Sequence, residues 1–161
     1  MEFIIRKKQN SDNAWITELL RRDWGGDFIT TRGVKYSPRD LRGFIAENKQ
    51  KVVGICLYNI KNEECEIVLL EAFVQYQGIG TGLLEKLRDQ NRRENWKRMW
   101  LVTTNDNIDA LRFYQKRGFE LLKIHRNAIS KSRKIKPTIP ETGNYGISIR
   151  DEIELELKQE N

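Results

Sequence analysis

A run of glycines between a strand-like and a helix-like segment constrains this chain more than any other feature. The apolar run 65–74 is followed by Gln75-Tyr76-Gln77-Gly78-Ile79-Gly80-Thr81-Gly82, and then by Leu83, Leu84 and Leu87 at helical spacing. Glycines let backbone N–H groups approach an anion closely, and a helix that begins directly after them adds the positive end of its dipole. The turn therefore predicts either a diphosphate-like ligand or a tight connection without a ligand.

Two familiar phosphate-binding patterns fit the turn poorly. A P-loop places Lys and then Ser or Thr directly after its last glycine, whereas Leu83 follows Gly82 here. The dinucleotide fingerprint spaces its glycines as Gly-x-Gly-x-x-Gly, usually after the first strand of a domain. Here Gly78, Gly80 and Gly82 alternate, and three or four predicted strands precede them.

The rest of the chain has the pattern of a mixed α/β protein. Apolar runs predict strands over 3–6, 44–46, 52–58, 65–74, 99–102, 119–124 and 149–157, the last half-exposed with glutamates on one face. Helices are predicted after an N-cap at Ser11, directly after the glycine turn, and over 108–116. We expect a loop over 25–40 with one helical turn at 38–40, and a long loop over 126–146. Strands precede strand–helix units, which indicates an α/β fold with a mixed sheet.

Length and composition limit the class of protein. A chain of 161 residues fits a single domain over 1–161 that fills its core without disulfides. No run approaches the ~20 apolar residues that cross a bilayer. The charges of the first eight residues follow the apolar ones, unlike those of a secretory signal. We therefore expect a cytoplasmic protein without a membrane partner.

Cysteine and histidine are too few for a zinc site. Cys56 and Cys65 lie in apolar alternating runs without a Cys-x-x-Cys pair, and His125 is the only histidine. We expect two buried free thiols and no bound metal.

The formal net charge of +6 is concentrated in the middle of the chain. Residues 86–136 hold 15 basic and 5 acidic residues, a net charge of +10, whereas 1–85 are neutral and 137–161 carry −4. Such a block indicates an anionic partner, either nucleic acid or a phosphate-bearing small molecule, or a solvated basic surface. Neither aromatic interleaving nor a nucleic-acid-binding signature accompanies it, which disfavours nucleic acid.

A second motif follows a predicted strand downstream of the turn. Asn107, Ala110, Tyr114 and the pair Gly118-Phe119 occur in the order Asn-x-x-Ala-x-x-x-Tyr-x-x-x-Gly-Phe. Together with Gln75-x-x-Gly78-x-Gly80, this order resembles the GNAT superfamily of acetyl-CoA-dependent N-acetyltransferases over roughly residues 3–124 and into the last strand. The frame Gln77-x-x-Gly80-x-Gly82 also fits the cofactor pattern of that family.

The resemblance implies a fold and a cofactor site. The fold would be a mostly antiparallel central sheet of six or seven strands, flanked by helices, with a splayed parallel pair formed by 65–74 and 99–103. Acetyl-CoA would lie in that cleft as the acetyl donor. The residues that the resemblance assigns to the cofactor are Ala72, Phe73, Val74, Gln75, Gln77, Gly78, Ile79, Gly80, Thr81, Asn107 and Tyr114.

The resemblance also implies acetyl transfer to a primary amine. Tyr114 matches the position of the family's general acid, and a neutral phenol can donate a proton to a thiolate. Glu66 and Glu71 are candidate bases, expected on opposite faces because they are five residues apart on a strand; a water chain is the alternative. Trp24 and Tyr36 either shape the acceptor pocket or merely cover the core.

Transfer would be direct, through a tetrahedral intermediate. The acceptor would be a small-molecule amine or a protein or peptide amine, and the sequence does not identify it. A catalytically inactive acyl-CoA-binding sensor or scaffold is the alternative function. Homodimers are common in this family, and the terminal strand could mediate one here.

Overall fold

One seven-stranded sheet runs through the molecule. The computed structural model describes residues 1–159, so residues 160–161 of the predicted single domain lie outside the described chain. The strand order is β1-β4-β5-β6-β7-β9-β8, with a separate two-stranded hairpin, β2-β3. Neighbouring strands of the large sheet are antiparallel, except for the parallel pair β6 and β7. The predicted α/β fold with its mostly antiparallel sheet is confirmed.

The predicted strands are all present, with ends shifted by at most three residues. The strands are β1 (Ile4–Lys7), β2 (Ile29–Thr31), β3 (Val34–Tyr36), β4 (Arg42–Asn48), β5 (Lys51–Lys61), β6 (Glu64–Ala72), β7 (Arg98–Thr104), β8 (Glu120–His125) and β9 (Glu152–Lys158). The helices are α1 (Asn13–Asp23), α2 (Ile79–Glu94), α3 (Ile108–Gln115) and α4 (Ala128–Ile135), with 3₁₀ turns η1 (Asn10–Asp12), η2 (Pro38–Asp40) and η3 (Asn144–Gly146).

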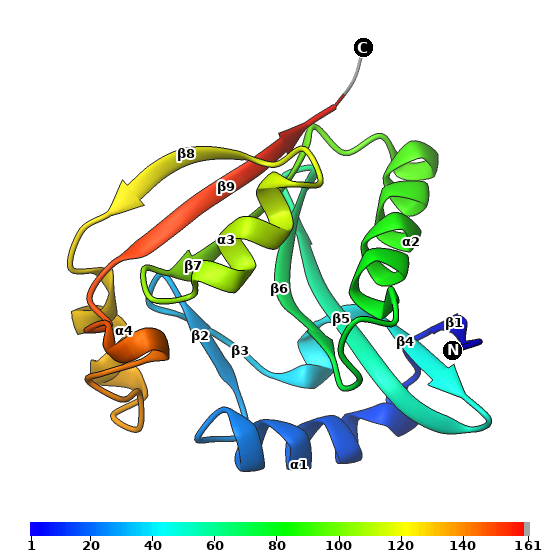
Figure 1. Ribbon diagram of the computed structural model, residues 1–161, viewed down its shortest axis with the longest axis horizontal. Coiled ribbons are helices and arrows are strands. Elements are labelled where there is room, and N and C mark those ends of the chain that lie inside the picture. The colour runs from blue at the N-terminus through cyan, green and yellow to red at the C-terminus, as the bar shows by residue number, and fades with distance from the viewer. Residues whose placement is uncertain (160–161) are drawn as a thin grey trace.

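Apolar side chains form two separate cores, one on each face of the sheet. Figure 1 shows the helices that contribute to them, α2 and α3 to one core and α1 to the other. On one face, Leu83 and Leu84 of α2 and the side chains of α3 pack against Cys56 and other alternate residues of β5. On the other face, Leu20 of α1 and the hairpin pack against Ile55 and its alternate neighbours. The period-two alternation of β5 thus supplies both cores at once.

The start of α1 differs from the prediction at Ser11. That residue lies inside η1, and Asp12 is the N-cap residue of α1. The Asp12 carboxylate accepts hydrogen bonds from the Gln9 backbone N–H at 2.7 Å, from the Trp15 indole at 2.9 Å and from Arg6. A carboxylate with three donors holds the chain entry more firmly than the Ser11 hydroxyl can.

The loop predicted over 25–40 is wrong for its central part. Residues 29–36 form the hairpin β2-β3, and Arg32 and Gly33 make its two-residue turn with φ of 51° and 72°. Two positive φ values are typical of a turn whose twist matches that of paired strands. The two strands, Ile-Thr-Thr and Val-Lys-Tyr, are three residues long, which is too short to show an alternating apolar pattern. The helical turn predicted at 38–40 is confirmed as η2.

The long loop predicted over 126–146 is also wrong. It contains α4 and η3, and only two positions of α4, Ile129 and Ser132, are buried. Two buried positions, of which only Ile129 is apolar, are too few to show the 3.6-residue apolar repeat of a helix in the sequence. Tertiary contacts hold the segment instead, since Arg133 donates to the carbonyls of Pro140 and Ile149 at 2.8 and 2.9 Å.

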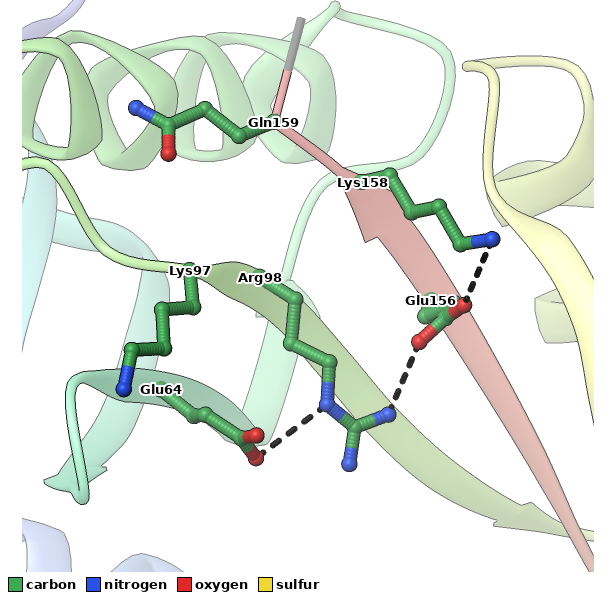
Figure 2. Close-up of a pocket in the computed structure, with 6 residues that line it drawn as sticks. All are labelled: Glu64, Lys97, Arg98, Glu156, Lys158 and Gln159. Atoms are coloured by element: carbon green, nitrogen blue, oxygen red, sulfur yellow. Dashed lines mark hydrogen bonds and ion pairs between the residues drawn. The ribbon is translucent and has the colours of Figure 1, made fainter.

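The glutamate face of β9 is buried, contrary to the half-exposed strand predicted from its alternation. Glu152, Glu154 and Glu156 are 3%, 8% and 7% exposed. Arg98 of β7 explains most of this burial, because its guanidinium contacts Glu154 and Glu156 of β9 at 3.0 Å and Glu64 of β6 at 3.1 Å. Figure 2 shows Arg98 between Glu64 and Glu156, where it ties three adjacent strands together.

We expect Arg98→Met to destabilise the fold. The substitution keeps the apolar stem but leaves three partly buried carboxylates without their cation, which costs roughly 1–3 kcal/mol. Urea denaturation followed by circular dichroism measures the difference. Lys97→Met is the matched control, because Lys97 and its partner Glu63 are exposed, and its midpoint should stay near that of the wild type. Equal midpoints for the two variants would contradict the role given to Arg98.

Candidate functional site

The parallel ladder between β6 and β7 is very short. It joins Glu64 to Arg98, Cys65 to Met99 and Glu66 to Trp100, and no pairing follows within the described chain although both strands continue. Beyond Glu66, the β7-facing edge of β6 therefore presents backbone N–H and C=O groups that β7 does not pair. Such an edge can pair with an extended ligand.

A cavity of about 1130 Å³ fills the space where the two strands separate. It extends from the glycine turn and the start of α2, past the ends of β6 and β7, to α4 and the start of β9. Nearly all the residues predicted for the cofactor line it: Ala72, Val74, Gln75, Gln77, Gly78, Ile79, Gly80, Thr81, Asn107 and Tyr114. Phe73 does not line it and packs instead in the core beneath α1.

The first turn of α2 presents backbone N–H groups to this cavity. Gly78 is the N-cap residue with φ of 75°, and the first hydrogen bond within the helix runs from the N–H of Gly82 to the carbonyl of Gly78. The N–H groups of Ile79, Gly80 and Thr81 therefore have no acceptor within the helix. Together with the positive end of the helix dipole, they form a site for a phosphate group.

Close packing fixes the height of this helix end above the sheet. A Cβ added to Gly54 of β5 would lie 2.5 Å from Ile79, and one added to Gly82 would lie 3.0 Å from the ring of Phe3. These two glycines thus let α2 start directly on the sheet. Gly54 lies in the middle of an apolar strand, and no spacing in the sequence connects it with the turn.

Three cations from the end of α3 line the same side of the cavity. They are Arg112, Lys116 and Arg117. Arg117 donates to the Thr81 hydroxyl at 2.7 Å and lies over the ring of Phe113, with 3.7 Å between guanidinium and ring centroid. The start of α2 and these side chains together produce a positive electrostatic potential at this end of the cavity. All three cations belong to the basic block of 86–136.

The motif of 107–119 positions Asn107 and Tyr114 on α3. The Asn107 side chain caps the helix by accepting from the Ala110 N–H at 3.2 Å. Tyr114 is 6% exposed, and its ring meets those of Phe113 and Phe119 edge-on at 5.1 and 5.2 Å. Burial raises the pKa of the Tyr114 phenol, so it is neutral at physiological pH.

Glu66 and Glu71 lie on the same face of β6, and the opposite faces predicted from their spacing are wrong. The register with β5 skips Val68, because Tyr58 pairs with Ile67 while Leu57 pairs with Leu69. This β-bulge adds one residue and reverses the alternation beyond it. Both carboxylates consequently face the side of α1 and the hairpin.

The two carboxylates nevertheless have different surroundings. Glu66 is 3% exposed and accepts from the Tyr36 hydroxyl at 2.7 Å and from Arg32 at 3.2 Å. Arg32 also lies over Trp100, 4.4 Å from its ring centroid, so the hairpin tip covers the point where the ladder ends. Neither Glu66 nor Tyr36 lines the cavity, whereas Glu71 and Trp24 do.

Glu71 is a half-buried carboxylate within the cavity. Its Oε2 atom is buried without a hydrogen-bond partner. Burial raises the pKa of Glu71, and the Trp24 indole lowers it only in part. A carboxylate with a raised pKa beside a cavity is well suited to accept a proton.

Several cavity residues escaped the sequence analysis because tertiary contacts bring them there. Ser132 of α4 donates to Glu152 of β9 at 3.4 Å, and the Arg32 backbone N–H contacts the same carboxylate at 3.1 Å. Lys136, at the end of α4, donates to the Phe28 carbonyl at 2.7 Å. Thr31 completes this wall. The alternating glutamates of β9 were the one signal in the sequence for these contacts. A strand that buries a row of carboxylates needs hydrogen-bond donors or cations from other segments to pair them.

Comparisons with known proteins agree on one family. The model of the Acetyltransferase (GNAT) family matches residues 13–119. YdhI of Bacillus subtilis (strain 168), named as an uncharacterized protein, is 37% identical over 139 residues, which cover 86% of this chain and 87% of YdhI. This chain therefore belongs to the GNAT family of acetyltransferases.

Solved structures share the fold at low sequence identity. The IAA acetyltransferase from Bacillus cereus ATCC 14579 superposes with a TM-score of 0.72 at 19% identity, covering 98% of this chain and all of that chain. A GNAT family acetyltransferase from Elizabethkingia anophelis with acetyl-CoA bound gives a TM-score of 0.69 at 20% identity, covering 98% of each chain. Within residues 1–159, none of the helices has the length and apolar character to cross a membrane.

We expect Glu71→Gln to stabilise the protein at neutral pH. Because the pKa of Glu71 is raised in the folded state, ionisation above that pKa destabilises the fold relative to the unfolded chain. The gain in melting temperature should fade as the pH falls below the ordinary glutamate value of 4.5, where both states are protonated.

Melting curves from pH 4 to pH 8 measure this difference. Glu120→Gln, on the exposed strand β8, is the control and should change the melting temperature little at any pH. A lower melting temperature for Glu71→Gln at neutral pH would show that the carboxylate stabilises the fold.

Proposed function

We propose that this protein is an N-acetyltransferase that moves the acetyl group of acetyl-CoA directly to a primary amine. The observation that carries the proposal is the early end of the β6–β7 ladder at Glu66 and Trp100. It opens one cavity that joins the start of α2, the Tyr114 side chain and the Glu71 carboxylate. A donor and an acceptor can meet there without a covalent enzyme intermediate.

The donor would enter along the glycine turn. Its pyrophosphate is matched by the N–H groups at the start of α2, with the cations of α3 nearby. Its pantetheine arm carries amide groups, which can pair with the main chain of 72–74, at the end of β6 and directly after it. A main-chain N–H of the same segment is our candidate for stabilising the oxyanion of the tetrahedral intermediate.

Glu71 is our candidate base, in preference to Glu66. Tyr36 and Arg32 hold the Glu66 carboxylate outside the cavity lining, whereas Glu71 lines the cavity and has no ion-pair partner in the described chain. An ammonium has no lone pair and must lose a proton before it can attack. Glu71, or a water molecule that it orients, would take that proton.

The proposed reaction moves the acetyl group from sulfur to nitrogen in one addition and one elimination. The amine nitrogen attacks the thioester carbonyl carbon, a C–N bond forms, and the carbonyl oxygen becomes an oxyanion. When the oxyanion collapses, the C–S bond breaks and the thiolate takes the proton of the Tyr114 phenol. The attacking nitrogen, which is positively charged in the intermediate, loses a second proton, and this proton reprotonates Tyr114 through water. The first proton, taken from the ammonium by Glu71, passes to solvent, so the products are an amide and a free thiol.

Two measurements test the proposal. Titration calorimetry with acetyl-CoA measures donor binding, and a thiol assay measures CoA release with a panel of polyamines, amino acids and peptides. We expect binding together with turnover on at least one primary amine. Binding without turnover on any acceptor would favour an acyl-CoA sensor or scaffold, and the absence of binding would refute the donor assignment.

We expect Tyr114→Phe to lower kcat about tenfold or more, with little change in the affinity for acetyl-CoA. The substitution removes the proton donor but keeps the ring that packs between Phe113 and Phe119. Steady-state kinetics and calorimetry separate the two effects. An unchanged kcat would exclude Tyr114 as the acid.

A further inference from the structure

The end of the cavity away from the glycine turn, which we call the acceptor end, is lined by the carboxylates of Glu71 and Glu152. The inference drawn from it rests on the proposed N-acetyltransferase function. We propose that the acceptor is a small diamine whose reacting amine lies beside Glu71 while its second, protonated amine binds Glu152. Glu71 belongs to β6, one arm of the separated pair. Glu152 lies on the other side, opposite Thr104 at the end of β7.

The wall around Glu152 favours a small acceptor over a peptide. The α4 segment is fastened to the residues after α1, because Lys136 donates to the Phe28 carbonyl at 2.7 Å and Thr138 donates to the Gly25 carbonyl at 2.9 Å. Ile129, Ser132 and Thr138 of this segment line the cavity. The contacts place a wall across the acceptor end, where a peptide would need an open groove.

Two of the five glutamates on the hairpin side of β6 and β9 differ from the others in having no ion pair among the described residues. Glu66 pairs with Arg32 at 3.2 Å, and Glu154 and Glu156 pair with Arg98 at 3.0 Å. Within residues 1–159, neither Glu71 nor Glu152 has a lysine, arginine or histidine nitrogen within the 4.0 Å of a salt bridge. Glu71 and Glu152 are also the two of these five that line the cavity.

Glu152 is accordingly a buried carboxylate held by neutral donors alone. It is 3% exposed, and its partners are the Arg32 backbone N–H and the Ser132 hydroxyl. A buried charge without a counter-charge is unfavourable, and a bound ammonium offsets this with charge-assisted hydrogen bonds. A monoamine beside Glu71 would leave the second carboxylate uncompensated.

Thr31 points independently to a polar ligand at the same place. It is 9% exposed, it lines the cavity, and its hydroxyl oxygen is buried without a hydrogen-bond partner in the described chain. Buried hydroxyls are nearly always paired. Thr31 is the neighbour of Arg32, whose N–H contacts Glu152. An ammonium has three donors, so it can bind the carboxylate and the hydroxyl together.

The experiment compares each linear diamine, from propane-1,3-diamine to hexane-1,6-diamine, with the amino alcohol of equal chain length. Both contain the reacting amine, but the amino alcohol lacks the second charge. We expect the kcat/KM of the best diamine to exceed that of its amino alcohol by about tenfold or more. Equal values for every pair, or turnover with peptides alone, would overturn the diamine assignment and leave the acetyltransferase intact.

Glu152→Gln and Glu154→Gln form a matched pair of variants. Each neutralises one buried glutamate of β9, but Glu154 is paired with Arg98 and His125 outside the cavity lining. We expect Glu152→Gln to reduce the diamine preference at least threefold and Glu154→Gln to preserve it. The same preference in all three proteins would overturn the role of Glu152.

Thr31→Val supplies a second test that does not depend on a charge change. Because the hydroxyl has no partner in the fold, the variant should fold with undiminished stability and should raise the KM of the diamine more than that of the amino alcohol. Equal changes in both would contradict the inference. If acetyl-CoA binds but no amine of any kind is acetylated, the proposed function fails, and the diamine assignment fails with it.

Discussion

Three residue pairs of parallel ladder between β6 and β7 determine where everything else in this molecule can act. Arg98 closes one end of the pair by contacting carboxylates on both of its neighbours. At the other end, the tip of the hairpin places Arg32 over Trp100 and against Glu66, where the pairing stops. A longer ladder would fill the cavity, and a shorter one would leave the sheet without a connection between its two halves. The site exists because the pairing is both anchored and interrupted.

The two ends of the cavity carry opposite charge. The start of α2 and the cations of α3 make one end positive, while Glu71 and Glu152 make the other end acidic. Only some of the basic residues of 86–136 therefore face the cavity, where they can attract an anionic ligand. Arg98 joins strands, and Arg133 and Lys136 fasten α4 to backbone carbonyls. A count of charges cannot separate these uses, because it contains no information on which cations have partners.

The parts of the site that local sequence encodes were predicted, and those that depend on tertiary contacts were not. Gly78 and Asn107 act at helix ends within a few residues of themselves, so their motifs were readable. The bulge at Val68 depends on pairing with β5, and it reversed the prediction for Glu66 and Glu71. The hairpin and α4 bury too few apolar side chains to show a period. Their positions follow from hydrogen bonds to distant carbonyls and carboxylates, which no spacing reveals.

Buried polar atoms without a hydrogen-bond partner are concentrated in the hairpin β2-β3 and the strand β6. Seven buried side-chain atoms of the described chain lack a hydrogen-bond partner, and five of them belong to Thr30, Thr31, Arg32, Glu66 and Glu71. The other two belong to Asn13 and Arg88. The Arg98 guanidinium, by contrast, pairs with carboxylates on both neighbouring strands. Unpaired buried groups destabilise a fold, so their concentration in one region points to a use other than stability. Three of the five, Thr30, Thr31 and Glu71, line the cavity, and their unpaired atoms are oxygens. A ligand with N–H donors can pair these oxygens, which connects the stability of the resting protein to what the cavity can bind.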